Sequence, residues 1–396
     1  NTIVFICSKS EDFNMLYFIL HYKYGGFMNK KQFILGCALS ILIIVAVISG
    51  TVKLLEPKHT EPAYSTDVSN EPSNNLAEST TEEPTTTNTF TIDLSFIGDC
   101  LCATDENTYY ANCFNDVADE KKPKYFLSKV SNIFLNDDFT MADCENVYSD
   151  SKNLKVRDKG QYADPGMRAF WFKSAAKNAT ILSAGGIDGV SISNNHINDY
   201  GEQGHSDTKD ALDAANVKWG EEGTNIYFSK NGFNIAILCV SMYNSYAVDS
   251  IKEMLAEASE NSDYQIIYFH GGEEAIHVPE SWKKQACHDL INAGADLIMG
   301  DHPHVLQPME KYKGVTIIYS LGNFIFGGNR HPENRTIIYT HKLTITDGVL
   351  SNQSGKIIPC YVYTGDTNNW QPDVITNKAQ KKKVIKFMKG KADLPY

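Results

Sequence analysis

The chain has 396 residues, of which 42% are hydrophobic, and this is enough for one large folded domain or two of ordinary size. Its formal net charge of −12 argues against nucleic acid as a partner, because phosphate backbones are bound by basic surfaces. The sequence also contains no helix-turn-helix, zinc-finger or RNA-binding signature. We therefore expect no nucleic-acid partner.

The N-terminal part divides into three segments by composition. Residues 1–27 carry no recognisable pattern and form an uncertain extension. Residues 28–52 contain an uncharged run from Phe33 to Gly50, preceded by two lysines, which is long enough to cross a bilayer. It predicts a single-pass anchor in the cell membrane with the rest of the chain extracytoplasmic. A cleaved signal peptide is the alternative, but no small-residue cleavage site follows the run.

Residues 53–89 are rich in Thr, Glu, Pro and Ser and predict a disordered linker, because they offer too little apolar surface to form a core. From residue 90 to 365, short apolar runs alternate with helical stretches, a pattern typical of an α/β domain. One of these stretches predicts a helix that begins at Pro279 and is capped by Gly294.

Residues 366–396 form a basic tail. Its spacing predicts a solvated helix that turns its apolar residues inward, with a contact to anionic lipid as the alternative. The inward residues are Val384, Ile385, Phe387 and Met388. Seven of the nine cysteines lie in the domain; this odd number, without a C-x-x-C pair, indicates neither a zinc ribbon nor a complete disulfide framework.

Polar residues follow five apolar runs at the points where the predicted strands end. They are Asp99; Asp143 and Glu145; Asn194, Asn195, His196 and then Asp199; His270 and then Glu274; and Asp301, His302 and His304. In open α/β sheets, sites form beyond the carboxyl ends of the strands. Mixed carboxylate and imidazole ligands suit Mn²⁺, Fe²⁺ or Zn²⁺ better than Ca²⁺ or Mg²⁺. The sequence therefore predicts a divalent-metal site.

The stretch GDHPHV, residues 300–305, predicts the geometry of two of these ligands. Residues i and i+2 of an extended segment point the same way, so His302 and His304 would face one site. Pro303 disfavours the helical region for the residue before it, and we expect it to keep the pair extended.

The order of these motifs resembles the capsule synthesis protein CapA family, associated with poly-γ-glutamate production, within the calcineurin-like metallophosphoesterases. The matching stretches are FIGDCL, ADCEN, SNNHINDYGEQG, HGGEE, AGADLIMGDHPHVLQPMEKYKG and IIYSLGNFIF. They lie between about residue 92 and residue 330 and are dense after residue 185. The resemblance implies a four-layer α-β-β-α metallophosphatase-like sandwich.

The resemblance also implies roles for individual residues. The metal ligands would be Asp99, Glu145, Asn195, His270, His302 and His304, holding one or two ions, with Glu145 as the bridging carboxylate. His196 would be the general acid or charge stabiliser. Five further residues would support the ligands or contact the substrate, namely Asp143, Asn194, Asp199, Glu274 and Asn323.

This chain departs from the family pattern at three places. Asp99-Cys100-Leu101 lacks the histidine of Asp-x-His, which puts a second tightly bound ion in doubt. Asp143-Cys144-Glu145 replaces Asn-Leu-Glu, and His270-Gly271-Gly272 replaces His-Trp-Gly.

Each residue also has a purely structural alternative. The acids and asparagines at strand ends are common in turns, Glu274 could be a surface acid, and Asn323 could hold loop backbone.

A metal held in this way activates water and polarises an electrophile. The substrate would be an amide in poly-γ-glutamate or a related anionic surface polymer, or else a phosphoester. Membrane polymer-synthase subunits are the expected partners. The alternatives are a non-catalytic scaffold of a polymer-synthesis complex and a secreted metallophosphoesterase.

Overall fold

The computed structural model describes residues 87–157 and 169–396. The predicted anchor, and the predicted linker up to residue 86, lie outside these ranges. Within them, no helix combines the length and the apolar character needed to cross a membrane.

Seven strands form the first sheet. Their bounds are β1 (Thr89–Cys100), β3 (Phe139–Cys144), β6 (Gly189–Ser191), β7 (Lys218–Gly220), β14 (Arg335–Thr346), β15 (Val349–Tyr361) and β16 (Asp373–Val374). Their spatial order is β16-β15-β14-β1-β3-β6-β7. The pairs from β1 through β3 and β6 to β7 are parallel, whereas β14, β15 and β16 add antiparallel strands at the other edge.

Six strands form the second sheet. Their bounds are β8 (Ile226–Lys230), β9 (Phe233–Ser241), β10 (Tyr264–His270), β11 (Leu297–Asp301), β12 (Gln307–Tyr312) and β13 (Val315–Ser320). The order is β12-β13-β11-β10-β9-β8, with four parallel strands in the centre and antiparallel β12 and β8 at the edges. The central strands are apolar along their length because both of their faces are covered.

Helices cover the outer faces of both sheets, except α10 (Lys378–Met388), which packs on β12 and β15 and buries its apolar side chains in the cluster between the sheets. The bounds of the others are α3 (Phe114–Glu120), α4 (Lys124–Leu127), α5 (Ser131–Phe134), α6 (Thr180–Gly185), α7 (Gly201–Ala214), α8 (Val248–Ser259) and α9 (Ser281–Asn292), with short 3₁₀ helices at Ala176–Ala179 and Ser245–Ala247. A small third sheet joins β2 (Thr104–Asp105), β5 (Phe172–Ser174) and β4 (Val147–Tyr148).

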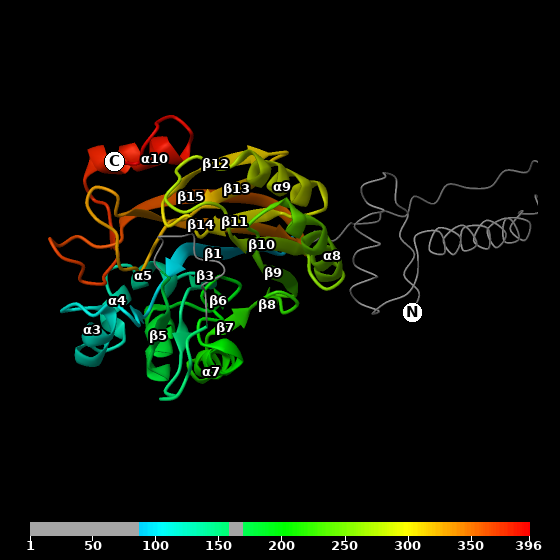
Figure 1. Ribbon diagram of the computed structural model, residues 1–396. Coiled ribbons are helices and arrows are strands. Elements are labelled where there is room, and N and C mark those ends of the chain that lie inside the picture. Colours follow the sequence, from blue (N-terminus) through cyan, green and yellow to red (C-terminus); the bar gives the residue numbers. More distant parts are fainter. Residues whose placement is uncertain (1–86, 158–168) are drawn as a thin grey trace, which may run out of the picture. The chain divides into compact units, whose positions relative to one another are not determined.

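Three apolar clusters fill the spaces between these layers. One lies between the two sheets and joins side chains of β1 and β3 to those of β9 and β10. A second packs α8 and α9 on the outer face of the second sheet, and a third packs α6 and α7 on the outer face of the first. The chain therefore has a mixed α/β fold of four layers, α-β-β-α, as Figure 1 shows.

Helix α9 and the basic C-terminal tail can be compared with the elements predicted from the sequence. Helix α9 begins at Ser281, two residues after Pro279, because Glu280 is still extended; Gly294 follows its end with φ +119°, as expected of a helix cap. The basic tail forms α10 as predicted, with its large apolar residues buried except for Ile385, which is half-buried. The tail thus belongs to the same compact unit as the sheets.

Strand β1 is irregular just before it ends. Its register with β3 shifts between Phe96 and Asp99. Gly98 lies in this shift, and a Cβ there would approach the carbonyl oxygen of Gly322 to 2.1 Å, so only glycine fits. Irregularities of this kind redirect a side chain beside a functional site.

Candidate metal centre

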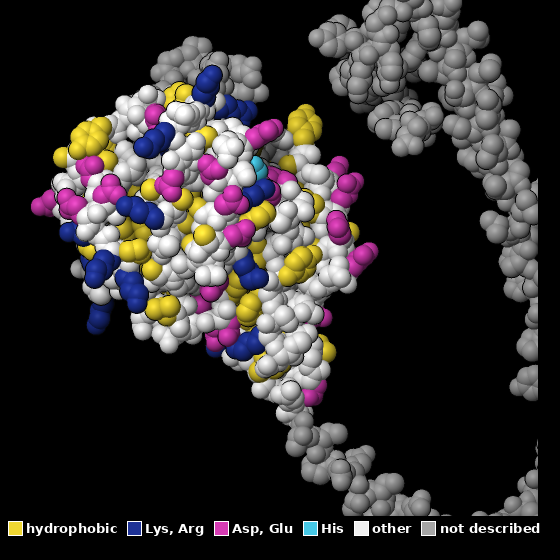
Figure 2. Space-filling model, turned by 90° about the horizontal axis from the view of Figure 1, so that it is seen from below, with side chains coloured by type: hydrophobic (Ala, Val, Ile, Leu, Met, Phe, Trp, Pro, Cys, Tyr) yellow, Lys and Arg dark blue, Asp and Glu magenta, His cyan; other side chains and the backbone are white. Residues whose placement is uncertain are grey.

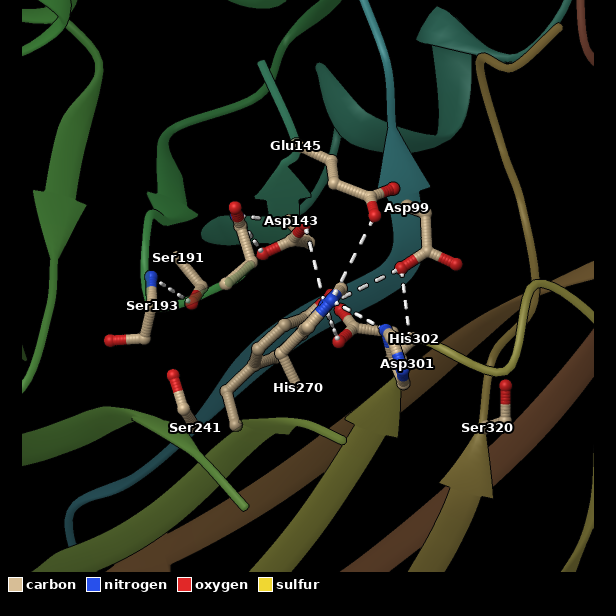
Figure 3. Close-up of polar contacts among 12 residues, drawn as sticks. Asp99, Asp143, Glu145, Ser191, Ser193, Ser241, His270, Asp301, His302 and Ser320 are labelled. Carbon is tan, nitrogen blue, oxygen red and sulfur yellow. Dashed lines mark hydrogen bonds and ion pairs between the residues drawn. The ribbon is translucent and has the colours of Figure 1, made fainter. Parts of the chain in front are cut away.

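Carboxylate and imidazole side chains from strand ends of both sheets lie close together. Asp99 and Asp143 are register partners in β1 and β3, and His270 and Asp301 are register partners at the ends of β10 and β11. His270 Nδ1 lies 3.7 Å from an oxygen of Asp99 and 3.7 Å from one of Asp143. Figure 3 shows the side chains of Asp99, Asp143 and Glu145 from the first sheet gathered around His270 from the second.

Glu145, His270 and His302 form the first group whose ligand atoms lie within reach of one ion. His270 Nε2 is 3.0 Å from His302 Nδ1, 2.9 Å from Asn195 Oδ1 and 3.8 Å from Glu145 Oε1. Burial lowers the pKa of His270 to about 3 and that of His302 to about 2, so both imidazoles are neutral at neutral pH. A neutral imidazole has a lone pair to offer to a metal.

The distances between the nitrogen and oxygen atoms of this group are those expected of ligands around a cation. His270 Nδ1 lies 2.8 Å from Asp301 Oδ1, and in the tautomer that donates this proton to Asp301 the Nε2 atom carries a lone pair. That lone pair faces the amide oxygen of Asn195, another acceptor, at 2.9 Å. Two ligand atoms that each lie about 2.1 Å from one ion at a right angle are about 3 Å apart. The spacing is therefore that of ligands around an ion.

Asp99, Glu145 and His304 form a second group. His304 Nδ1 is 3.3 Å from Asp99 Oδ2 and 2.9 Å from Asn323 Oδ1, and its Nε2 is 3.7 Å from Glu145 Oε1. Burial alone would lower the pKa of His304, but the hydrogen bond and charge of Asp99 raise it to about 9. Without an ion, Asp99 and His304 are thus an ion pair, and Glu145 lies between the two groups.

Three carboxyl groups of the cluster are buried where a negative charge is disfavoured. Burial, followed by the charges of neighbouring carboxylates, raises the pKa of Asp143, Glu145 and Asp301 well above the usual value. Neither oxygen of Glu145 has a hydrogen-bond partner among the described residues, although the side chain is fully buried. Buried charges are costly unless they are paired or bind a metal. The donor set therefore fits a divalent ion.

His196 lies at the edge of this cluster and has a carboxylate behind it. Its Nδ1 is 2.8 Å from Asp199 Oδ2, and its Nε2 is 3.9 Å from Glu145 Oε1. Asp199 also accepts a bond from the backbone N–H of Phe172 at 2.9 Å, which fixes its position. The arrangement orients Nε2 of His196 toward the cluster.

The structure brings all twelve predicted site residues into this region. Asn194 donates through Nδ2 to both oxygens of Asp143, at 3.1 and 3.2 Å, and to the carbonyl of Cys144. Glu274 is exposed but belongs to a third group with His302 and His304. The roles of these residues as ligands, acid or substrate contacts stay predictions.

The predicted extended backbone of the histidine pair is wrong, although both side chains face one site as expected. Strand β11 ends at Asp301, and His302 and His304 have φ values of +89° and +58° instead of extended backbone. The chain must turn here to return through antiparallel β12, so an extended segment does not fit. Positive φ in residues other than glycine costs about 1–3 kcal/mol and is concentrated at functional sites.

Sequence reasoning assigned no role to two residues of the site. Asp301 accepts the Nδ1 proton of His270 and so selects the tautomer that faces the cluster. Tyr243 donates its hydroxyl to Asn195 Oδ1 at 3.3 Å and places its ring edge-on to His302 at 5.1 Å. Both residues end or follow apolar strands, which is the signal that identified the other site residues.

The position after His270 has no room for a large side chain. A Cβ on Gly271 would lie 1.9 Å from the carbonyl oxygen of Met242. The tryptophan found there in the family pattern is therefore incompatible with this backbone, and Tyr243, the residue after Met242, provides an aromatic ring beside the histidines.

The fold and the clustered side chains define an α/β protein of the metallophosphatase-like class. The chain belongs to the family described as bacterial capsule synthesis protein PGA_cap, whose model matches residues 93–328. This confirms the resemblance to the CapA family that the sequence motifs indicated.

Two relatives illustrate this similarity, and one solved structure was compared with the chain. The chain is 28% identical over 269 residues to PGA biosynthesis protein CapA of Bacillus subtilis (strain 168), covering 62% of this chain and 66% of that protein. It is 28% identical over 246 residues to Capsule biosynthesis protein CapA of Bacillus anthracis, covering 54% and 57%. The matches thus cover less than two-thirds of either relative. The crystal structure of TT1561 of Thermus thermophilus has 11% identity and a TM-score of 0.36, covering 63% of this chain and 94% of that one, a similarity too low to support a conclusion.

Proposed function

We propose that this protein acts in the synthesis, export or processing of poly-γ-glutamate or a related anionic surface polymer, through a divalent-metal hydrolase centre. In this proposal the domain is held outside the cell by the anchor at residues 28–52 and works beside membrane polymer-synthase subunits. The observation that carries it is the fully buried carboxyl group of Glu145, which has no hydrogen-bond partner among the described residues and belongs to two groups of side chains that could hold a metal. The identity of the polymer is inferred from the description of the family and from the names of the relatives.

The chain offers two adjoining places for an ion. Asn195, His270 and His302 would hold one ion, Asp99 and His304 the other, and Glu145 would bridge them. Mn²⁺, Fe²⁺ and Zn²⁺ accept this mixed donor set. A bound ion supplies Lewis-acid polarisation of a substrate carbonyl and lowers the pKa of a water molecule.

The protein itself supplies the proton for the leaving group. Hydrolysis of an amide requires protonation of the departing nitrogen, which is otherwise a poor leaving group. We assign this role to His196, and its support is geometric: Nδ1 lies 2.8 Å from Asp199 Oδ2, and Nε2 faces Glu145 at 3.9 Å. Tyr243 faces the same region with a neutral hydroxyl, since burial raises its pKa far above the usual value.

Metal content provides the first test. Purified protein is expected to retain close to stoichiometric Mn, Fe or Zn, and His302→Ala is expected to lose most of it, because removal of one imidazole leaves the first group incomplete. Elemental analysis by mass spectrometry after gel filtration measures this. His288→Ala is the matched control, since His288 pairs with Glu310 away from the site. Equal metal in both variants, or none in the wild type after reconstitution under reducing conditions, would contradict a metal centre.

The reaction is tested with His196→Asn. Metal-loaded wild type is expected to shorten poly-γ-glutamate, and the variant to do so about a hundredfold more slowly, because the proton donor is lost. Polymer length and newly released amino groups are measured, with a phosphodiester assayed in parallel. Hydrolysis of the phosphodiester alone would favour a phosphoesterase. Metal binding without any hydrolysis would favour a scaffold in a synthesis complex.

A further inference from the structure

The outer face of α10 carries a row of lysines that the candidate centre does not use. Its members are Lys378, Lys382, Lys386 and Lys389, here called the α10 lysine stripe. They recur every three or four residues, and all four are exposed. From first to last the stripe extends about 16 Å at the rise of an α-helix.

Acidic side chains are nearly absent from α10 and from the two strands on which it packs, β12 and β15. Helix α10 itself contains no acidic residue, and neither does β15, on which it packs. Strand β12, its other support, has a single acid, Glu310, which is bonded to His288 and Tyr319. By contrast, the face drawn in Figure 2 mixes Lys and Arg with Asp and Glu. A local basic row on a chain of net charge −12 favours a polyanion there.

The stripe is connected to the candidate centre through the buried face of the same helix. The ring of Phe387 packs edge-on against His277 with centroids 5.4 Å apart, and His277 Nδ1 is 2.8 Å from the carbonyl oxygen of Leu306. His277 lies three residues after Glu274, and Leu306 lies two after His304. The helix therefore supports the two loops that border the centre.

A lipid surface fits this helix less well than a soluble chain. Helices that lie on membranes insert an apolar face into the headgroup region. The large apolar side chains of α10, Val384, Phe387 and Met388, are already buried in the protein. The exposed face of α10 therefore offers a partner mainly positive charge. A flexible polyanion can bind through charge alone.

We propose that the α10 lysine stripe binds the carboxylates of the poly-γ-glutamate chain and holds it beside the centre. This inference rests on the proposed function for the identity of the polymer. The stripe would bind several consecutive glutamate units at once, so it would contribute to the binding of long chains and not to that of a single γ-glutamyl bond.

The test replaces three of the four lysines with a neutral residue of similar helix propensity, in Lys382→Gln/Lys386→Gln/Lys389→Gln. Binding of fluorescently labelled poly-γ-glutamate is expected to weaken about tenfold at low salt, which corresponds to three exposed charge interactions. The difference is expected to shrink at about 0.3 M salt, because exposed charges are screened. The matched control, Lys122→Gln/Lys218→Gln/Lys313→Gln, removes the same charge from dispersed exposed positions.

Two outcomes would overturn the proposal: equal weakening in both triple variants, or loss of binding to vesicles containing anionic lipid with polymer binding unchanged. Hydrolysis of a γ-glutamyl tripeptide, which is too short to span the stripe, keeps the two proposals apart. It is expected to be equal in the stripe variant and in the wild type. Stripe-dependent polymer binding without tripeptide hydrolysis by any form would contradict the hydrolase centre and leave the stripe supported.

Discussion

Glu145→Gln is expected to abolish metal-dependent hydrolysis and, at the same time, to stabilise the metal-free protein. Both effects have one cause, which is that the buried carboxyl group has no hydrogen-bond partner among the described residues. Loss of the charge that bridges the two ligand groups is expected to lower kcat by at least about 10²–10³-fold, as for other groups that stabilise charge in an active site.

The stability of the metal-free variant changes in the opposite direction. Glutamine replaces a group whose ionised form is disfavoured by burial, and its amide can donate toward imidazole nitrogens that lie 3.7–3.9 Å from Glu145 Oε1. The free energy of unfolding of the chelator-treated protein is therefore expected to rise by about 1–3 kcal/mol. Urea unfolding with and without added metal measures this.

A matched control separates this effect from a general loss of charge. Glu221 is partly exposed and pairs with Lys209 and His205 away from the centre. Glu221→Gln is expected to cost less than about 1 kcal/mol and to leave hydrolysis unchanged. If Glu145→Gln destabilised the metal-free protein, the carboxylate would have a compensating partner, and the case for a cation between the two groups would fail.

The location of the site was predictable because the sequence marks where strands end. In β10 and β11, apolar runs stop at His270 and Asp301, and in β1 and β3 the acids stand close to the last positions. Parallel strands bring their carboxyl ends to one edge, and two packed sheets bring two such edges together. The order of polar residues along the chain therefore predicted a cluster before any distance was known.

What could not be predicted depends on register and on backbone turns. The role of Asp301 depends on its pairing with His270 across β10 and β11, which no local pattern encodes. Tyr243 reaches Asn195 only because β9 lies beside β10 in the second sheet. The positive φ of His302 is set by the turn toward β12, and the adjacent proline favoured the opposite expectation.

The metal-free protein is expected to lose stability between about pH 6.5 and pH 9. Burial raises the pKa of Asp143, Glu145 and Asp301 well above the usual value. A carboxyl group with a raised pKa contributes stability that is present below its unfolded pKa and is lost as the pH rises through the folded pKa. For His304, the folded pKa of about 9 exceeds the unfolded value, so its contribution is also lost as the pH rises through this window.

The histidines with lowered pKa act in the opposite direction, but only at lower pH. His270 and His302 have folded pKa values of about 3 and about 2, so they add stability as the pH rises toward 6.5 and contribute no further change above it. Burial raises the pKa of Asp99, but the hydrogen bond and charge of His304, together with His270 and the backbone N–H of His302, bring it below the usual value, so Asp99 is ionised in both states above pH 6.5. Within the window, His304 and the three carboxyl groups therefore change the stability in the same direction, toward a loss as the pH rises.

Metal binding is expected to remove this pH dependence, because an ion neutralises the carboxylates and displaces the proton of His304. One proton bound preferentially by the folded state corresponds to about 1.4 kcal/mol per pH unit. A fall of at least about 2 kcal/mol across the window is thus expected for chelator-treated protein, and a nearly flat profile with saturating Mn²⁺. Urea unfolding at pH 6.5, 7.5 and 8.5 provides both curves. If the free energy of unfolding fell equally with pH in the presence and absence of Mn²⁺, the ion would not contact these carboxylates. If the two curves met at pH 6.5 and separated at higher pH, the ion would lie among them.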